Sequence, residues 1–317
     1  MALFSGSPPY RFTHRDDLHS VPSFAHQFEL RVHGSFAKDR RQGFGELYYG
    51  IPKLGLMRVA NDLRTQTFIK LPETVGQFNF HSTKLGQVNG QPRLFLSANY
   101  NSLVAVLHLD GTVDFVLPRP EFEQYQTASI EYAPTDSIVV DDNLFIVDGY
   151  GSNFVSKVNL PQRQWVSIFG GKTEQPVDGK FTTAHGITRH PVNNQLLISD
   201  RPNSRIERYA VDGRYLASHY LPSGAWPCGL DCIQWHGKWI GVVGCLHDPN
   251  KNRPAPIYIL DMESFSVLST IRPKEELGVE RAVHIHNAVW HILDDHLFLV
   301  CQSWKPGRYF VLEHVVG

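Results

Sequence analysis

Three histidines recur at nearly equal intervals along this 317-residue chain, and their spacing predicts a metal site. His81, His185 and His286 are separated by 104 residues (81 to 185) and 101 residues (185 to 286). Three imidazoles that converge from separate elements are the usual protein half of an open zinc site, in which a fourth position stays free for water or substrate. Fe²⁺ and Mn²⁺ suit such ligands too. The alternative for any single histidine is a structural role, in which the ring caps a strand and hydrogen-bonds a neighbouring carbonyl.

The segments that must position these histidines have the pattern of short β-strands. Runs of Val, Ile, Leu, Phe and Tyr are bounded by Gly, Asn, Asp and Pro, and the i, i+3, i+4 spacing of amphipathic helices is nearly absent. Examples are residues 144–147, 196–199, 239–243 and 297–300. Such runs with tight turns between them predict antiparallel hairpins and an all-β fold.

A repeated unit then predicts the architecture. Residues 183–213 contain a strand, a turn, a strand, a loop, a strand and a second turn. Comparable units start near residues 80, 134, 227 and 285, and a degenerate first unit covers 45–71. About six four-stranded units predict one six-bladed β-propeller rather than two domains. We assign the propeller to residues 41–317. Residues 1–40 are expected to form an arm with a ring-closing strand at 28–32.

The register of the repeat places the three histidines on alternate blades. The residue at the start of the innermost strand changes from blade to blade, and in chain order it is His81, Thr135, His185, Cys228 and His286. In a closed ring of six, alternate blades point three side chains at the central axis. A purely structural role has no reason to select alternate blades, so the register favours the metal site.

Motifs within these units carry a family resemblance. They are Asp148-Gly149-Tyr150, His185-Gly186-Ile187 and the run from Ser199 through Asp200-Arg201-Pro202-Asn203 to Ile206. Over residues 75–315, and most strongly over 134–213, the chain resembles NHL-repeat propellers and, more closely, the peptidyl-hydroxyglycine amidating lyases. Members of that family are six-bladed zinc enzymes that split a carbinolamide into an amide and glyoxylate. The resemblance implies metal ligation by His81, His185 and His286, a catalytic role for Tyr150 and a substrate contact for Arg201.

The residue chemistry of Tyr150 and Arg201 is consistent with those roles. Both follow the second strand of adjacent units, so both belong at the end of the ring where the histidines open. A tyrosine near a dication can have a lowered pKa and act as a general base. An arginine offers a rigid fork to a carboxylate. The alternatives are an aromatic loop plug for Tyr150 and a hydrogen-bond donor between blades for Arg201.

The chain departs from the family around the third ligand. The family has Met-Pro-His-Asp, whereas this chain has His284-Ile285-His286-Asn287. We expect His284 to act as a proton shuttle, to touch substrate, or to compete with His286 as the ligand. Asn287 and Tyr100 are further candidate substrate contacts. Lys53 is a weak match for an arginine that the family carries in its first blade.

The remaining candidates are two cysteines and one loop. Cys228 has the register of the histidines on an intervening blade, where it is either a substrate contact or an inert buried thiol. Cys245 lies about opposite on the partner strand, but a disulfide is not expected in a reducing compartment. His247 and Asp248, in the long loop 246–256, are either a lid over the same face or a solvated loop.

Composition narrows the function classes. Lys and Arg number 30 against 31 Asp and Glu, and 16 residues are His. This balance speaks against a broad nucleic-acid surface. No apolar run reaches the roughly 18 residues of a membrane helix, and the amino terminus lacks the pattern of a signal peptide. With only four Cys, the expected location is cytoplasmic and the expected partner is a small molecule.

These observations together predict a metal-dependent lyase. It would cleave a carbinolamide-like C–N bond, or a related C–X bond, in a small, polar, anionic substrate. Zn²⁺ is the expected metal, Fe²⁺ and Mn²⁺ are alternatives, and a structural Ca²⁺ is a further candidate. A metal-dependent hydrolase at the same site and a non-catalytic NHL-type binding propeller remain open. So does a calcium-dependent lactonase-like propeller, although it would place oxygen ligands on the axis.

Overall fold

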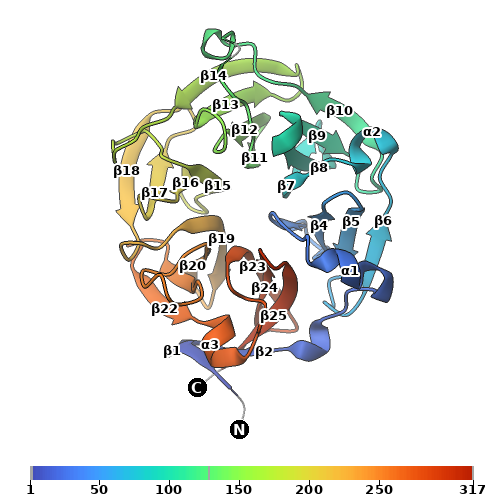
Figure 1. Cartoon of the computed structure of the whole chain (residues 1–317), viewed down its shortest axis with the longest axis vertical. Coiled ribbons are helices and arrows are strands. Elements are labelled where there is room, and N and C mark those ends of the chain that lie inside the picture. The colour runs from blue at the N-terminus through green and yellow to red at the C-terminus, as the bar shows by residue number, and fades with distance from the viewer. Residues whose placement is uncertain (1–2, 128, 316–317) are drawn as a thin grey trace.

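The protein is a six-bladed β-propeller in a computed structural model that describes residues 3–127 and 129–315 (Figure 1). Six antiparallel sheets surround a central axis, and each runs from an innermost strand near the axis to an outer strand at the rim. The predicted all-β, six-bladed fold class is therefore confirmed. None of the described helices is both long enough and apolar enough to cross a membrane.

Five blades are each formed by four consecutive strands that run in chain order from the axis to the rim. Blade 1 contains β3 (Ala37–Lys38), β4 (Leu47–Ile51), β5 (Gly55–Val59) and β6 (Gln66–Ile69). Blade 2 contains β7 (Phe80–Val88), β8 (Gln91–Ala98), β9 (Leu103–Leu107) and β10 (Val113–Leu117). Blade 3 contains β11 (Asp136–Val140), β12 (Asn143–Val147), β13 (Phe154–Asn159) and β14 (Gln164–Gly170). Blade 4 contains β15 (Ala184–Arg189), β16 (Leu196–Asp200), β17 (Arg205–Tyr209) and β18 (Tyr215–Tyr220). Blade 5 contains β19 (Pro227–Trp235), β20 (Lys238–Cys245), β21 (Ile257–Asp261) and β22 (Val267–Ile271).

The sixth blade joins the two ends of the chain. Its inner strands are β23 (Ile285–Leu293), β24 (His296–Ser303) and β25 (Arg308–Val315), and its outer strands are β2 (Tyr10–His14) and β1 (Ser5–Ser7). The N-terminal β2 pairs with the C-terminal β25 in antiparallel fashion. The ring is therefore closed by main-chain hydrogen bonds between segments about 300 residues apart in sequence.

The closing strand is not the one expected at residues 28–32, and that prediction is wrong. Those residues fall in α1 (His26–Glu29) and the turn after it. Contacts of Glu29 favour a helical turn over a strand here. Its buried carboxylate accepts the Tyr309 backbone N–H at 3.0 Å and lies 2.7 Å from His19 Nε2. The first blade also begins with β3, which precedes residue 41.

Short helices fill the connections between strands. Besides α1 there are α2 (Glu73–Gly76) and α3 (Pro273–Leu277). Single 3₁₀ turns occur at Asp16–Leu18, Ser23–Ala25, Asn99–Asn101 and Glu123–Tyr125. None of these helices exceeds five residues in the described chain, so the strands carry the fold.

Turn chemistry fixes the hairpins within the blades. Asp141, Asn194 and Gly213 each have positive φ, at 53°, 58° and 92°. Asp, Asn and Gly tolerate the left-handed region that such turns require. These positions coincide with the turns expected from the sequence, which explains why the strand registers of blades 3 and 4 follow the predicted repeat.

The hydrophobic core lies between neighbouring blades rather than on the axis. Six clusters of buried apolar side chains occupy the six junctions between successive sheets of the described structure. The junction between blades 5 and 6, for example, contains Trp290, Leu299, Phe310 and Phe12. Because each sheet is packed on both faces, the axis is left for polar residues at the ends of the inner strands.

The candidate functional residues lie at one end of the ring. The innermost strands begin there, and the loops that follow the second strands return there because hairpin partners run antiparallel. We call this end the histidine face, after His33, His81, His185 and His286, which lie at the starts of innermost strands or just before them.

Candidate active site

Four imidazoles meet on the axis at the histidine face. The rings of His81, His185 and His286 form a nearly regular triangle, with centroid separations of 4.8, 4.9 and 4.7 Å. All three side chains are buried. The structure thus brings together the three histidines that the sequence spacing singled out.

Hydrogen bonds orient two of these rings. His81 Nδ1 donates to the Thr135 carbonyl at 2.6 Å, and His286 Nδ1 donates to the Gly34 carbonyl at 2.9 Å. A proton on Nδ1 leaves the Nε2 lone pair free, which is the form that binds metals. Burial also lowers the pKa of both rings and of His185 well below the usual histidine range, so all three are neutral at pH 7.

Unsatisfied nitrogens indicate that the cluster fits a metal ion. His286 Nε2 and His185 Nδ1 are buried without a hydrogen-bond partner. His185 Nε2 lies 3.2 Å from His81 Nε2. Two nitrogens bound about 2.0–2.1 Å from one zinc ion would be separated by about 3.3 Å. A buried polar atom without a partner is costly in a folded protein. An ion shared by the Nε2 atoms of the three rings would remove that cost for His286 Nε2, whereas His185 Nδ1, on the other side of its ring, would keep it.

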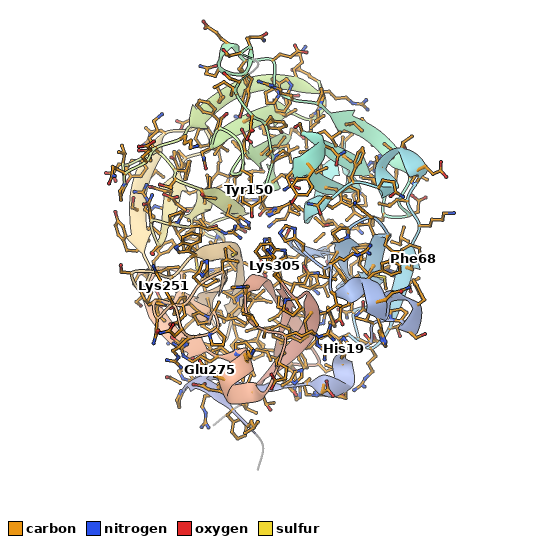
Figure 2. All side chains as sticks on the ribbon, in the orientation of Figure 1. His19, Phe68, Tyr150, Lys251, Glu275 and Lys305 are labelled. Carbon is orange, nitrogen blue, oxygen red and sulfur yellow. The ribbon has the colours of Figure 1, made fainter. Side chains whose placement is uncertain are left out.

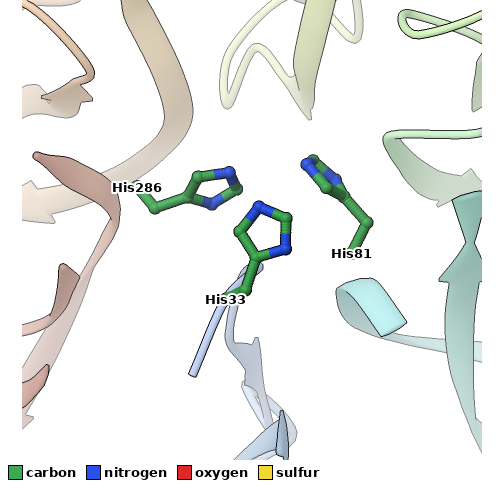
Figure 3. Close-up of side chains that lie close together, drawn as sticks. All are labelled: His33, His81 and His286. Carbon is green, nitrogen blue, oxygen red and sulfur yellow. The ribbon is translucent and has the colours of Figure 1, made fainter. Parts of the chain in front are cut away.

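His33 is the fourth imidazole, and the sequence reasoning missed it. Figure 3 shows its ring next to those of His81 and His286, and the centroid separations are 4.5 Å and 4.4 Å. Ligand nitrogens of His33, His81 and His286 all lie within 4.8 Å of one another, a group that does not include His185. Burial, followed by the charge of Arg201, lowers the pKa of His33 to about 3. The dipeptide His33-Gly34, which matches His185-Gly186, was the signal available in the sequence.

Tyr150 and Arg201 lie directly over this cluster. Tyr150 Oη is 3.2 Å from His81 Nε2, and Arg201 Nη1 donates to the same Oη at 2.8 Å. Figure 2 labels Tyr150 at the inner end of its blade, near the axis. Burial raises the pKa of Tyr150, while the guanidinium of Arg201 opposes that rise. The phenol therefore holds its proton between an imidazole acceptor and a cationic donor.

Arg201 is a buried cation without a carboxylate partner. Its side chain is 4% exposed, and no ion pair of this residue is found within the described chain. Its Nη2 donates to Cys228 Sγ at 3.0 Å, and its Nε has no partner. A buried guanidinium is normally neutralised by an acid, so this one is a candidate site for the anionic group of a ligand.

The turn that carries Tyr150 is built rigidly. Asp148 accepts hydrogen bonds from Ala133 N at 2.6 Å, Ser152 N at 2.9 Å and Tyr125 Oη at 2.8 Å. Gly149 has no room for a side chain, because a Cβ there would collide with the Ala184 carbonyl of the next blade. The Asp148-Gly149-Tyr150 motif therefore serves to place the phenol over the axis.

Cys228 lies in the wall of the site as a free thiol. It is fully buried, and burial raises its pKa against the opposing pull of Arg201. Cys245 is also free, and all four cysteines of the chain are unpaired. The thiol of Cys228 accepts one of the Arg201 N–H groups, which helps to fix the guanidinium.

His284 and Asn287, on either side of His286 in sequence, do not join the imidazole cluster. His284 precedes β23, its Nδ1 donates to the Leu246 carbonyl at 2.7 Å, and its ring lies 5.7 Å from that of His247. Asn287 is buried and accepts the Phe36 backbone N–H at 3.2 Å, which ties blade 6 to blade 1. The register of β23 shifts between Ile285 and Asn287, so simple alternation along the strand breaks down at this point.

The other candidates lie farther out on the same face. Tyr100 is 81% exposed on the 3₁₀ turn after β8, and Lys53 is exposed in the turn between β4 and β5. Asp248 is buried in an ion pair with Arg272 at 2.8 Å, whereas His247 packs edge-on against Trp226 at 4.5 Å. In the loop 246–256, His247 thus lies beside His284, with its ring 5.7 Å from that imidazole.

Trp304 completes that rim and was also missed. It follows β24 directly, and its ring stacks on His33 at 5.3 Å with an interplanar angle of 28°. It lies 6.3 Å from His284 and 6.4 Å from His286. Trp304 occupies the position after a second strand, as Tyr150 and Arg201 do in their blades, and that shared position was the signal for it.

Deeper on the axis, the ammonium group of Lys84 lies beside the carboxylate of Asp136. Lys84 Nζ lies 3.1 Å from Asp136 Oδ2 and donates to the Ile187 carbonyl at 3.3 Å. A void of about 10 Å³ separates Asp136 from the imidazoles. Within residues 3–127 and 129–315 there is no group of three carboxylates suited to calcium.

The opposite end of the axis opens into a cavity of about 500 Å³ lined by Lys38, Arg189 and other residues of the inner strands.

Comparisons with known proteins identify the fold only. No protein-family model and no curated protein sequence matches the chain. Among solved structures, a gluconolactonase from Xanthomonas campestris has 14% sequence identity and a TM-score of 0.62, covering 99% of this chain and 97% of that one. A luciferin-regenerating enzyme has 12% identity and a TM-score of 0.60, covering 90% and 92%. Virginiamycin B lyase from Staphylococcus aureus has 11% identity and a TM-score of 0.56, covering 92% and 97%. The structural neighbours of this propeller thus include enzymes.

Proposed function

We propose that this chain is a metal-dependent lyase that cleaves a carbinolamide-like C–N bond in a small anionic substrate. The observation that carries the proposal is the position of Arg201, a buried guanidinium without a carboxylate partner, beside the Tyr150 hydroxyl and over a cluster of neutral imidazoles. An anion site, a proton carrier and a set of nitrogen ligands converge on one point of the axis. The resemblance of the sequence to the amidating lyases supports the same reaction class.

His81, His185 and His286 would hold the metal, and Zn²⁺ is the ion that their chemistry and the resemblance favour. A divalent ion at this position supplies a Lewis acid for a substrate oxygen. The orphaned His286 Nε2 and the close pair of Nε2 atoms on His81 and His185 support this ligand set.

The side chains account for the remaining steps. Arg201 binds the substrate carboxylate through N–H groups that no acid occupies. Burial raises the pKa of Tyr150, while Arg201 opposes that rise and a bound dication would lower the pKa further. In that state Tyr150 would take the proton from the carbinol hydroxyl. The carbinol C–O bond becomes a carbonyl as the C–N bond breaks, and its electron pair goes to nitrogen. That nitrogen takes the proton back from Tyr150, which yields an amide and an α-keto acid or aldehyde acid.

Hydrolysis is the alternative reaction at the same site, since a gluconolactonase shares the fold. A calcium-dependent lactonase is less well supported, because calcium prefers oxygen ligands and the described axial cluster consists of nitrogens. A non-catalytic binding propeller gives no reason for a buried, unpaired arginine.

The experiment combines metal analysis with a defined substrate. Protein purified without chelators is expected to contain about one equivalent of a transition metal and to release glyoxylate from an N-acyl-α-hydroxyglycine. His185→Ala should lose both properties, and His296→Ala, at a histidine whose side chain is 62% exposed, should keep both. Far less than one equivalent of metal in the unaltered protein, or glyoxylate release that survives His185→Ala, would contradict the proposal.

A further inference from the structure

His33 stands in the same register as the three predicted ligands. Three glycines mark that register, since each follows an axial residue and faces the next blade. A Cβ on Gly34 would collide with the His81 carbonyl, one on Gly186 with the Cys228 carbonyl, and one on Gly229 with the side-chain amide of Asn287. Gly186 follows His185 and Gly229 follows Cys228, so Gly34 makes His33 the axial residue of blade 1.

The loop that carries His33 is anchored on both sides. Val32 is fully buried, and the Gly34 carbonyl receives the Nδ1 proton of His286. Ser35 Oγ donates to the Thr83 carbonyl and accepts the Thr83 N–H, both at 3.2 Å. Trp304 stacks on the imidazole from the outside. His33 is therefore held over the axis by contacts to blades 2 and 6 and is not a free loop residue.

From this geometry we infer that His33 is a fourth protein ligand, and that the centre holds its ion in five or six coordination. The inference rests on the proposed metal centre and specifies its ligand set. Four imidazoles would fill a tetrahedral zinc ion, so substrate could bind Zn²⁺ here only if the ion took a fifth ligand. Ions that take six ligands, such as Fe²⁺ or Mn²⁺, keep two positions open with the same four imidazoles.

Ring spacing supports the higher coordination number. Five of the six centroid separations among the four rings fall between 4.4 and 4.9 Å. Imidazoles bound at right angles around one ion would have centroids about 4.5 Å apart, and tetrahedral angles would place them about 5.2 Å apart. The observed centroid spacing lies closer to the right-angle arrangement, in which ligands occupy neighbouring corners of an octahedron. The 3.2 Å between the Nε2 atoms of His81 and His185 lies between the about 2.9 Å of right angles and the about 3.3 Å of tetrahedral angles.

The test uses Co²⁺ as the probe, because its visible absorption reports coordination number without any substrate. Chelator-treated protein is titrated with Co²⁺, and X-ray absorption of the loaded protein counts imidazole ligands. We expect four imidazoles and the weak bands of five- or six-coordinate Co²⁺ in the unaltered chain. In His33→Ala we expect three imidazoles, stronger bands and a loss of Co²⁺ affinity of roughly tenfold or more. His296→Ala, which alters an exposed imidazole at the first residue of β24, away from the histidine face, should match the unaltered protein.

The outcomes separate this inference from the proposed function. Three imidazoles in the unaltered chain, or the same affinity and spectrum in His33→Ala, would overturn the role of His33 while leaving the metal centre intact. Failure of Co²⁺ to bind the unaltered chain would overturn the metal centre itself. His33→Asn serves as a second variant, and thermal unfolding of both apo proteins shows whether the loop still folds.

Discussion

At the scale of single residues, the site depends on groups whose polar atoms are left without protein partners. Arg201 Nε and His286 Nε2 are buried and unbonded, and Arg201 meets a phenol and a thiol where an acid would be expected. Asp200, its neighbour in sequence, cannot serve it, because Asp200 Oδ2 binds Arg205 Nε at 3.0 Å and Asn203 Nδ2 at 2.6 Å. Asp200 therefore does not neutralise the positive charge of Arg201, which remains available to an anionic ligand.

Replacement of Arg201 should separate stability from activity. Arg201→Met removes a buried charge that lacks a protein counter-ion, so we expect an unchanged or higher melting temperature. The same change should raise KM and lower kcat/KM by roughly 10- to 100-fold, because charge-assisted hydrogen bonds to the substrate anion are lost. Thermal unfolding and steady-state kinetics measure the two effects. A clear loss of stability together with unchanged KM would show that Arg201 is only a structural link between blades.

Removal of the Tyr150 hydroxyl should affect turnover rather than binding. Tyr150→Phe keeps the ring that packs on His81 at 4.9 Å but removes the oxygen that bridges His81 and Arg201. We expect kcat to fall by about 10²–10⁴-fold with little change in KM. Tyr100→Phe, at an exposed ring, is the control. Equal kinetics in Tyr150→Phe and the unaltered enzyme would exclude proton transfer by this phenol.

At the scale of elements, the β16–β17 hairpin of blade 4 holds the site in place through Arg205, which lies on the strand next to the one that Arg201 follows. Arg205 is fully buried on β17, pairs with Asp200 across the hairpin, and lies 2.8 Å from Glu207. It also donates to the carbonyls of Val177 at 2.9 Å and Lys180 at 2.8 Å. This one guanidinium thus fixes the end of β16 from which Arg201 projects.

Glu207 makes the stability of this hairpin depend on pH. Burial raises its pKa to about 7, against the pull of Arg205, compared with about 4.3 in an unfolded chain. Between these values the folded state binds the extra proton, so stability falls as pH rises from about 4.3 to 7. Glu207→Gln should remove this dependence, which we expect to be on the order of 1–3 kcal/mol. Urea unfolding at pH 5 and pH 8 measures it, with exposed Glu263→Gln as the control. Identical pH slopes in the unaltered protein and Glu207→Gln would refute the prediction.

At the scale of the whole molecule, the ring is closed by its N-terminal strand. Phe12 on β2 is fully buried between blades 5 and 6, with its ring 6.2 Å from that of Trp290 and 5.5 Å from that of His314. Closure also places blade 1 beside blade 6, so that His33 and His286 lie next to each other. The site therefore depends on a contact that forms between residues about 300 positions apart.

Truncation of that contact should destabilise the entire ring. Phe12→Ala is expected to lower the free energy of unfolding by about 3–5 kcal/mol, because it leaves a cavity in a fully packed junction. Phe24→Ala, at a ring that is 49% exposed, should change it by less than about 1 kcal/mol. Denaturant unfolding provides the comparison. Similar losses in the two variants would mean that β2 contributes no more than a surface residue.

Local sequence patterns were sufficient to predict the class of fold and the three histidines on alternate blades. Those patterns are alternating strands, turn residues such as Asp141 and Asn194, and a repeat whose register counts blades. Tyr150 in the Asp148-Gly149-Tyr150 turn and Arg201 were found through the family resemblance, and both follow the second strands of adjacent units.

Long-range packing, in contrast, sets what closes the ring and what completes the cluster. Residues 28–32 alternate like a strand, but their partners are His19, Tyr309 and other distant groups, which favour a helical turn with Glu29 buried. His33 and Trp304 belong to irregular segments, in which the repeat is too degraded for the register of the blade to be read from the sequence. Their positions follow from packing between the first and last blades, and a pattern that is read along one segment contains no information about such long-range contacts.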